Sequence, residues 1–290
     1  MGTPKNPPFA ICANLLTHLF LAEIPQYTKY SGISATQCEP KSLAQIIKKE
    51  FLAVALCFGG LMKKLTTYFS KGELTLWGSS AGLVLVSFFL FDRVNFMTLA
   101  ASLIGTTSLI FNAKGNPIGQ ALMVVFSLLY GVISYTFSYF GEMITYLGMT
   151  GPMALFALIS WLRNPYEGNH AEVAVNRIGK WEYSGMYLAT AVVTLGFYFI
   201  LEYFNTANII PSTLSVATSF IAVYLTFRRS PYFALAYAAN DVVLIFLWTM
   251  AAKENISYLS VIICFVMFLV NDLYGFVSWK RMERRQAVSV

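Results

Sequence analysis

The chain is short of charge. Only 12% of its 290 residues are Asp, Glu, Lys or Arg, whereas soluble domains have about 25%, and 57% of its residues are hydrophobic. So few charged side chains cannot cover a water-facing surface, which excludes an ordinary soluble domain. We expect an all-α integral membrane protein, because lipid offers no hydrogen-bond partner to the backbone and a helix satisfies its own peptide groups.

Residues that bind metals or catalyse reactions are also scarce. The two histidines and four cysteines form no CxxC pair or ligand cluster, so the sequence supports neither a disulfide framework nor a zinc site. It contains no GxxxxGK[ST] phosphate loop, no HExxH motif and no nucleophile elbow. We therefore expect no enzyme activity, no cofactor and no metal.

Eight apolar windows are long enough to cross a bilayer, which takes about 20 helical residues. They span residues 74–91, 94–111, 118–137, 140–162, 183–204, 209–227, 231–251 and 256–278. Residues 1–73 are predicted to be an N-terminal segment in the cytoplasm or at the membrane interface. Within this segment, the apolar stretch 51–62 fits either a helix lying on the membrane or a ninth, tilted span.

The positive charge lies almost entirely on one side of the predicted helices. With eight spans, Arg93 and Lys253 fall on one side, and the other 18 of the 20 Lys and Arg fall on the opposite side. The positive-inside rule then predicts that both termini are cytoplasmic. The net charge of +6 thus follows the topology and implies no nucleic acid as a partner; the lipid bilayer is the expected one.

Two stretches of the chain, residues 94–163 and 209–281, read as the same three-helix unit written twice. The matched landmarks are separated by 116, 114 and 118 residues: Phe111 and Phe227, Pro117 and Pro231, and Trp161 and Trp279. Offsets that differ by so little indicate a duplication with small gaps.

A three-helix unit ends on the side of the membrane opposite to its start. One linker helix, residues 183–204, would give both copies the same orientation. The predicted architecture is therefore 3+1+3, with an additional helix at 74–91 in front and a cytoplasmic tail at 282–290. Parallel repeats of this kind occur in membrane transporters, which bind substrate near the midplane at the repeat interface.

Two amide–carboxylate pairs, Asn240-Asp241 and Asn271-Asp272, lie inside the last two predicted helices. An ionisable residue at the centre of a membrane helix costs roughly 2.5–3.5 kcal/mol on insertion scales. We therefore expect these four residues to have a functional or structural role. In one interpretation they bind a small polar ligand; in the other they form hydrogen bonds with one another and with nearby hydroxyl groups. The first copy is apolar at the matching positions. We predict an asymmetric site in which Asn240, Asn271 and Asp241 bind substrate.

Aromatic side chains accompany these amides. Tyr237 precedes Asn240 by three residues and Tyr274 follows Asn271 by three, so each ring shares a helix face with its amide. A flat heterocycle would stack on such rings while the amides bind its edge, although aromatic residues also pack cores. The predicted substrate-binding set is completed by Gln120, Trp248 and Tyr146.

For three further features, a structural role is either the favoured interpretation or an alternative to a role in function. Glu142 either caps a helix or stands at the entrance to the site. The Gly78-x-x-x-Gly82 pattern permits close helix packing but is common by chance. Trp161 and Trp279, beside arginines, are predicted to anchor the helices at the cytoplasmic interface.

Several segments resemble the PnuC family of bacterial vitamin transporters, in order and in spacing. They are Phe111 to Pro117, Tyr130 to Tyr135, Phe140 to Met143, Gly151 to Met153, Thr226 to Arg229, Asn240, and Asn271 to Trp279. The resemblance covers about residues 74–285. The chain departs from the family at Phe233 and Ala236, where members typically have tryptophan.

The resemblance implies a SWEET-like fold in the bacterial inner membrane, commonly as a homotrimer. It implies uptake of nicotinamide riboside by facilitated diffusion with alternating access, after which a cytoplasmic kinase traps the product. Similar proteins carry thiamine, riboflavin or nucleosides, and these substrates stay open for this chain. A membrane sensor that does not transport and a membrane-embedded lipid enzyme are the alternatives from other classes.

Overall fold

The computed structural model describes residues 67–136, 140–206, 208–253 and 256–288, and every structural statement below concerns these residues. The chain divides into two units, Met1–Leu74 and Thr75–Val290. In the described part of the first unit, the hydroxyl group of Ser70 accepts a hydrogen bond from the Glu73 N–H, and the Glu73 carboxylate accepts one from the Ser70 N–H. This capping box starts helix α3.

The described elements follow one another as α3 (Lys71–Ser87), η2 (Phe88–Asp92), α4 (Phe96–Ala113), α5 (Pro117–Thr136), α6 (Phe140–Ile144), η3 (Thr145–Thr150), α7 (Gly151–Leu162), β1 (Pro165–Tyr166), β2 (Asn169–Val173), α8 (Lys180–Tyr203), α9 (Ile209–Phe227), α10 (Phe233–Ala252), η4 (Ile256–Tyr258) and α11 (Leu259–Val288). Eight helical stretches among them are long and apolar enough to cross a membrane. Each of the eight overlaps one predicted window, so these predictions are confirmed. The predicted segment 51–62 lies outside the described residues.

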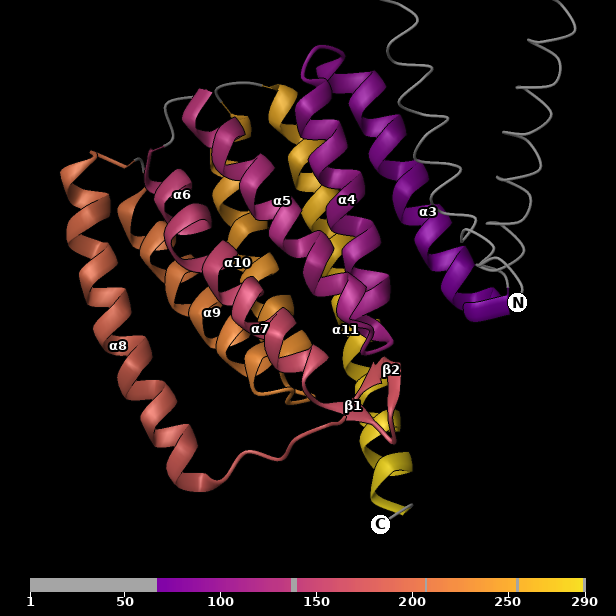
Figure 1. The fold of residues 1–290 in the computed structure, drawn as a ribbon. Coiled ribbons are helices and arrows are strands. Elements are labelled where there is room, and N and C mark those ends of the chain that lie inside the picture. Colours follow the sequence, from indigo (N-terminus) through magenta and orange to yellow (C-terminus); the bar gives the residue numbers. More distant parts are fainter. Residues whose placement is uncertain (1–66, 137–139, 207, 254–255, 289–290) are drawn as a thin grey trace, which may run out of the picture. The chain divides into compact units, whose positions relative to one another are not determined.

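The helices of the second unit pack side by side in an order that brings distant parts of the chain together (Figure 1). Helix α4 packs on α5 and α11, α10 packs on α9 and α11, and α8 packs on α9. Helix α7 contacts both α5 and α9. Residues 94–163 therefore contact residues 209–281, chiefly where α4 packs on α11 and where α7 and η3 pack on α9.

The turns after α4 and α9 are built in the same way, 114 residues apart. The Asn116 N–H donates to the Phe111 carbonyl and the Ser230 N–H to the Leu225 carbonyl, both at 3.0 Å. This is the Schellman bond pattern, which needs a residue with positive φ at the turn. Gly115 fills that position in the first turn, with φ 66°, and its counterpart Arg229 has φ 57°. The shared geometry supports the duplication inferred from the sequence.

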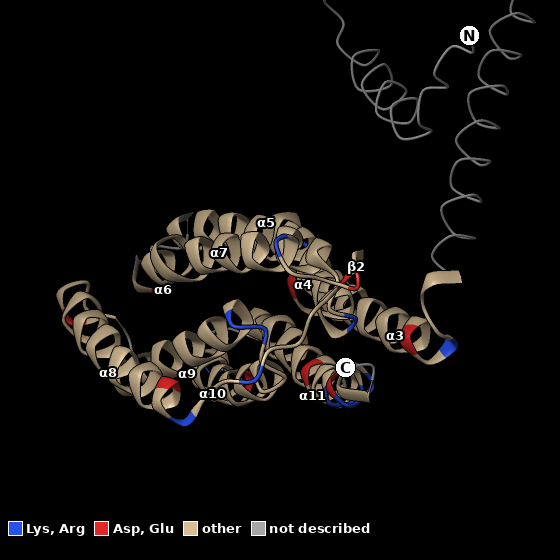
Figure 2. Ribbon diagram, turned by 60° about the horizontal axis from the view of Figure 1, so that its bottom comes forward, with Lys and Arg blue, Asp and Glu red and all other residues tan. Residues whose placement is uncertain are grey.

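Both turns lie at one end of the helices, which we call the basic end because it carries Lys114, Arg163, Arg228 and Lys280. In Figure 2 the Lys and Arg positions are coloured blue on the ribbon, and blue segments lie at the start of α8 and in the loops of this end. The opposite end carries the η2–α4, α5–α6 and α8–α9 connections. Which end faces the cytoplasm stays a prediction from the positive-inside rule.

A small antiparallel hairpin at the basic end was not predicted. Its strands β1 and β2 are joined by Glu167 and Gly168, both with positive φ, which is the backbone that a tight two-residue turn requires. Val173 is fully buried, and its N–H donates to the Gly115 carbonyl at 3.0 Å. Gln286, on α11, bonds to the Val173 carbonyl and to the Val175 N–H. These bonds explain why α11 runs ten residues beyond the predicted window that ends at 278.

The two glycines of the GxxxG pattern in α3 bring no other described helix close. A methyl group added at Gly78 or Gly82 would meet no atom within 4 Å. Gly105 on α4 does bring helices close together, because a Cβ there would lie 2.6 Å from the Phe268 ring of α11 and 3.2 Å from the Phe126 ring of α5.

Candidate functional site

Two adjoining cavities lie among the helices, toward the end opposite the basic end. The first, of about 40 Å³, is lined from α5, α6 and η3 on one side and from α9 and α10 on the other. The second, of about 110 Å³, reaches the outer connections at Asp92, Asn95 and Ser257. The first cavity therefore lies between residues 94–163 and residues 209–281, where a repeat-based transporter binds its substrate.

Three side chains, Tyr130, Glu142 and Trp248, line both cavities and form their common wall. The centroid of the Tyr130 ring lies 4.5 Å from that of Tyr146, which also lines the first cavity. Tyr130 and Trp248 are 8% and 6% exposed. The wall is thus a set of buried or partly buried aromatic rings with one carboxylate among them.

The local backbone explains how one helix supplies so much of this wall. The span Gly141–Leu162 is interrupted by the π-helical turn η3, which widens the helix by one residue per turn. Thr145, Tyr146 and Thr150 of this turn all line the first cavity. Single π turns inside α-helices are frequent at functional sites.

The ionisable side chains that line the cavities carry one sign of charge. Glu142 lines both and Asp92 lines the outer one, and no Lys, Arg or His is among the described lining residues. Asp92 is engaged locally, because its carboxylate accepts a hydrogen bond from the Asn95 amide at 2.6 Å. No described residue forms an ion pair with Glu142. The site therefore favours a positively charged or neutral ligand over an anion.

Helix α9 presents a row of hydroxyl groups to the first cavity. Ser212, Ser215 and Ser219 lie on one face of the helix, at spacings of three and four residues, and all three line the cavity. The Ser219 hydroxyl donates to the amide oxygen of Asn240 at 3.0 Å, and the Thr218 hydroxyl donates to the same oxygen at 2.8 Å. Asn240 is thus one hydrogen bond behind the cavity wall.

The structure places only some of the predicted binding residues at the cavities. Tyr146 and Trp248 line them, and Asn240 is attached to the wall through Ser219. Tyr237 packs on Phe233, nearer the basic end. Tyr274 lines neither cavity.

The other predicted amide and carboxyl side chains interact with residues that do not line the cavities. The Gln120 amide donates to Asn112 at 2.8 Å, and the Asn271 amide donates to Ser80 of α3, also at 2.8 Å. The Asp241 and Asp272 carboxyl groups lie close enough to each other to interact. One oxygen of Asp241 and the amide oxygen of Asn271 have no partner among the described residues. Substrate binding by these residues stays a prediction.

The wall residues that the sequence analysis did not assign to the site are Tyr130 and the α9 hydroxyl row. The row has a signal in the sequence, because Ser212, Ser215 and Ser219 repeat at helical spacing. Tyr130 has none, since many aromatic residues occupy the spans and only the packing of α5 against η3 selects this one.

The basic end is closed by two reciprocal hydrogen bonds. The Trp161 indole N–H donates to the Thr226 carbonyl at 2.9 Å, and the Trp279 indole N–H donates to the Asn112 carbonyl at 2.7 Å. Each tryptophan belongs to one copy of the repeat and each carbonyl to the other copy. The two rings lie 5.4 Å apart. The bonds tie the two copies together at this end.

The prediction that Trp161 and Trp279 anchor the helices at the membrane interface is wrong. Both side chains are 0% exposed and lie in the interior with Phe233. The physical reason is that Asn112 and Thr226 are in the last turns of α4 and α9, where carbonyls lack the i+4 donor of a continuing helix and can accept bonds from other groups. Each carbonyl accepts one backbone N–H from the following turn, that of Gly115 or Arg229, and the indole N–H is its second donor, so the rings turn inward.

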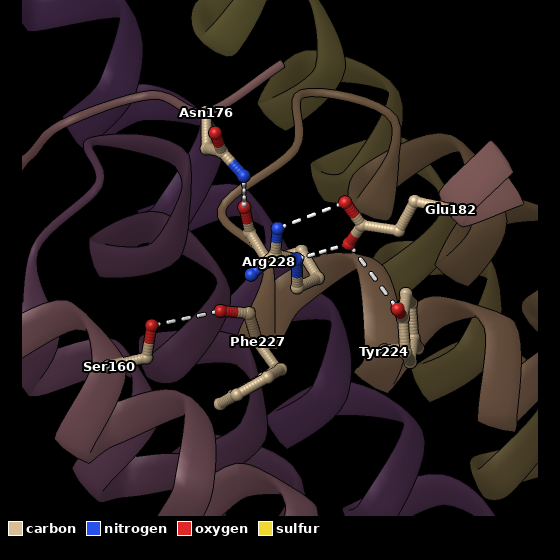
Figure 3. Close-up of polar contacts among 6 residues, drawn as sticks. All are labelled: Ser160, Asn176, Glu182, Tyr224, Phe227 and Arg228. Carbon is tan, nitrogen blue, oxygen red and sulfur yellow. Dashed lines mark hydrogen bonds and ion pairs between the residues drawn. The ribbon is translucent and has the colours of Figure 1, made fainter. Parts of the chain in front are cut away.

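Beside the two tryptophans, a cluster of polar side chains links the start of α8 and the loop before it to the end of α9 (Figure 3). Glu182 forms a two-pronged ion pair with Arg228 and also accepts a hydrogen bond from the Tyr224 hydroxyl at 3.3 Å. The Asn176 amide donates to the Arg228 carbonyl at 3.1 Å, and the Ser160 hydroxyl donates to the Phe227 carbonyl at 2.9 Å.

The neighbouring arginine sits in a less favourable environment. Burial of the Arg229 guanidinium lowers its pKa, and the positive charge of Arg228 lowers it further. The Asn176 N–H bonds to the Arg229 carbonyl at 3.0 Å and holds this strained turn in place. The two bonds that Asn176 makes therefore fasten the loop before α8 to the turn after α9.

The arrangement is that of a carrier for a small solute: a membrane-spanning helical bundle has small cavities between two repeats at one end and is closed at the opposite end. The chain belongs to the family described as nicotinamide mononucleotide transporters, whose family model matches residues 95–281. It is a multi-pass membrane protein of that transporter family, and the resemblance to PnuC proteins is confirmed.

Two relatives illustrate the match. The nicotinamide riboside transporter PnuC of Neisseria mucosa is 24% identical over 204 residues, which cover 69% of this chain and 77% of that protein. The crystal structure of the vitamin B3 transporter PnuC is 22% identical, with a TM-score of 0.65, and the match covers 75% of this chain and 94% of that one. The second comparison shows that the fold is shared.

Proposed function

We propose that this protein carries nicotinamide riboside across the bacterial inner membrane by facilitated diffusion. The observation that carries the proposal is the character of the cavity wall. It combines the rings of Tyr130, Tyr146 and Trp248 with the hydroxyl row of α9 and the carboxylate of Glu142. Aromatic rings stack on a flat pyridine ring, and hydroxyl groups bond to a ribose.

The charge of the wall favours the riboside over the mononucleotide for which the family is described. A phosphate group is normally held by Arg, Lys or a helix N-terminus. The described lining contains carboxylates and no Lys or Arg. A ligand without phosphate, and with a positive charge on its pyridine ring, suits this environment. The name of the Neisseria relative points to the same ligand.

The proposed mechanism is alternating access by two three-helix bundles, α4–α7 and α9–α11, joined by α8. The cavities lie toward the end opposite the basic end, the tryptophan bonds close the basic end, and the positive-inside rule predicts that the basic end is cytoplasmic. Rocking of one bundle against the other would break these bonds and open the inner end. Asn240, Asn271 and Asp241 are proposed to contact substrate during this passage. A cytoplasmic kinase would trap the product, and the protein would form a homotrimer.

A ligand screen on the purified protein tests this assignment. A ligand stabilises the state that it binds, so its affinity is read from the shift in melting temperature. At equal concentrations, nicotinamide riboside is expected to raise the melting temperature more than nicotinamide mononucleotide, thiamine, riboflavin or uridine. A larger shift with the mononucleotide would contradict the argument from charge. A larger shift with another vitamin would assign the protein a different substrate.

A further inference from the structure

We propose that Glu142 and the rings around it form a cage that selects for positive charge on the heterocycle of the ligand. Glu142 is the counter-ion, and Tyr130, Tyr146 and Trp248 are the faces of the cage. This inference rests on the proposed function and extends it, because it names the group that discriminates between a cationic ligand and a neutral ligand of the same shape.

The geometry gathers these groups from three helices onto one wall. Tyr130 comes from α5, Trp248 from α10, and Glu142 and Tyr146 from the helix that contains α6 and η3. Glu142, Tyr130 and Trp248 border both cavities, so a ligand that moves from the outer cavity to the inner one passes them. The rings of Tyr130 and Tyr146 are 4.5 Å apart and inclined by 46°.

The electrostatics of the cage suit a cation. Faces of aromatic rings carry partial negative charge, and rings arranged around a quaternary nitrogen are a known means of recognising it. In its ionised form, the carboxylate of Glu142 adds a negative charge in surroundings from which water is partly excluded, where Coulomb attraction to a cation is stronger than in water. Since no described cation pairs with Glu142, its charge is available to a ligand.

Glu142 differs in this respect from the second carboxylate of the cavities. Asp92 accepts hydrogen bonds from both the backbone and the side chain of Asn95, so it shapes the η2–α4 connection. Glu142 also lies deeper along the route, since it borders the inner cavity that Asp92 does not reach. Of the two carboxylates, Glu142 is therefore the one placed to interact with the charge of a bound ligand.

The test compares two ligands that differ in charge but have nearly the same shape. Nicotinamide riboside is cationic, and its reduced form, with a dihydropyridine ring, is neutral. Affinities for both are measured by titration calorimetry on the wild-type protein and on Glu142→Gln. We expect Glu142→Gln to weaken binding of the cationic form by roughly 30-fold, because the charge of the ligand loses its partner, and to change binding of the neutral form little.

Glu202→Gln is the matched control. It removes a carboxylate at the same end of the protein, but Glu202 is exposed on the last turn of α8 and lines neither cavity. The control is expected to bind both ligands like the wild type.

An equal loss of affinity for both ligands in Glu142→Gln would overturn the proposal, since it would show a role in structure only. Unchanged affinity for the cation would overturn it as well. If Glu142→Gln does not fold, Tyr146→Leu gives the same comparison, with a selective loss for the cation expected. A wild-type protein that binds neither ligand would contradict the proposed function itself, whereas one that binds both equally would contradict the cage alone.

Discussion

At the scale of single residues, Asn240 is positioned by its neighbours before any ligand arrives. Thr218 and Ser219 both donate to its amide oxygen, which leaves the amide nitrogen as the group that can bind a ligand. The sequence predicted Asn240 from its place inside an apolar helix. The two hydroxyl donors could not be predicted, because they lie 22 and 21 residues earlier on another helix, and their register depends on how α9 packs on α10.

Replacement of Asn240 is expected to weaken substrate binding. Asn240→Ala removes a polar group from behind the cavity and takes away the acceptor of the Ser219 hydroxyl, so we expect about a tenfold loss of affinity for nicotinamide riboside. Calorimetric titration measures this loss. Asn169→Ala, the same change on the β1–β2 hairpin at the basic end, should leave affinity unchanged. Equal affinities of Asn240→Ala and the wild type would place the binding site elsewhere.

Replacement of either tryptophan at the basic end is expected to lower the stability of the protein. Trp161→Phe and Trp279→Phe each remove one of the two hydrogen bonds that a buried carbonyl accepts, because the Arg229 and Gly115 N–H groups still donate to these carbonyls, and loss of one such bond costs about 0.5–1.5 kcal/mol. Both variants should therefore melt at a lower temperature than the wild type. Trp181→Phe is the matched control, because Trp181 is 91% exposed and its replacement should have no effect. Equal stability of all three variants would show that the indole bonds do not hold this end closed.

At the scale of elements, the sequence predicted the helices well and their ends less well. Apolar windows mark the spans, because lipid requires about 20 apolar residues. The β1–β2 hairpin and the long end of α11 were missed for a common reason. Each is held by the other, through Gln286 and Val173, and such mutual support between segments 113 residues apart leaves no local pattern.

The close approach of α4 to α11 and α5 depends on one glycine. Gly105→Ala would push a methyl group into the Phe268 ring, and overpacking of this kind costs about 1–3 kcal/mol. The melting temperature should fall accordingly. Gly196→Ala on α8 is the control, since nothing lies within 4 Å of its added methyl group and alanine favours the helix. A Gly105→Ala protein as stable as Gly196→Ala would mean that the contact relaxes freely.

At the scale of the whole molecule, a repeated framework carries a site that is not repeated. The Schellman turns at Gly115 and Arg229 and the bonds of Trp161 and Trp279 follow the duplication closely. The carboxylate of Glu142 and the hydroxyl row of α9 do not. The sequence showed the duplication through matched landmarks and predicted an asymmetric polar site, but it could not say which helices would face the cavity.

The most direct test of the central claim is uptake of radiolabelled nicotinamide riboside into proteoliposomes that contain the purified protein and no gradient of any other solute. A uniporter with no energy source can only equilibrate its substrate. Facilitated diffusion predicts uptake that is faster than in protein-free liposomes and that stops when the internal and external concentrations are equal. No uptake above that of protein-free liposomes, or accumulation well above the external concentration, would contradict it.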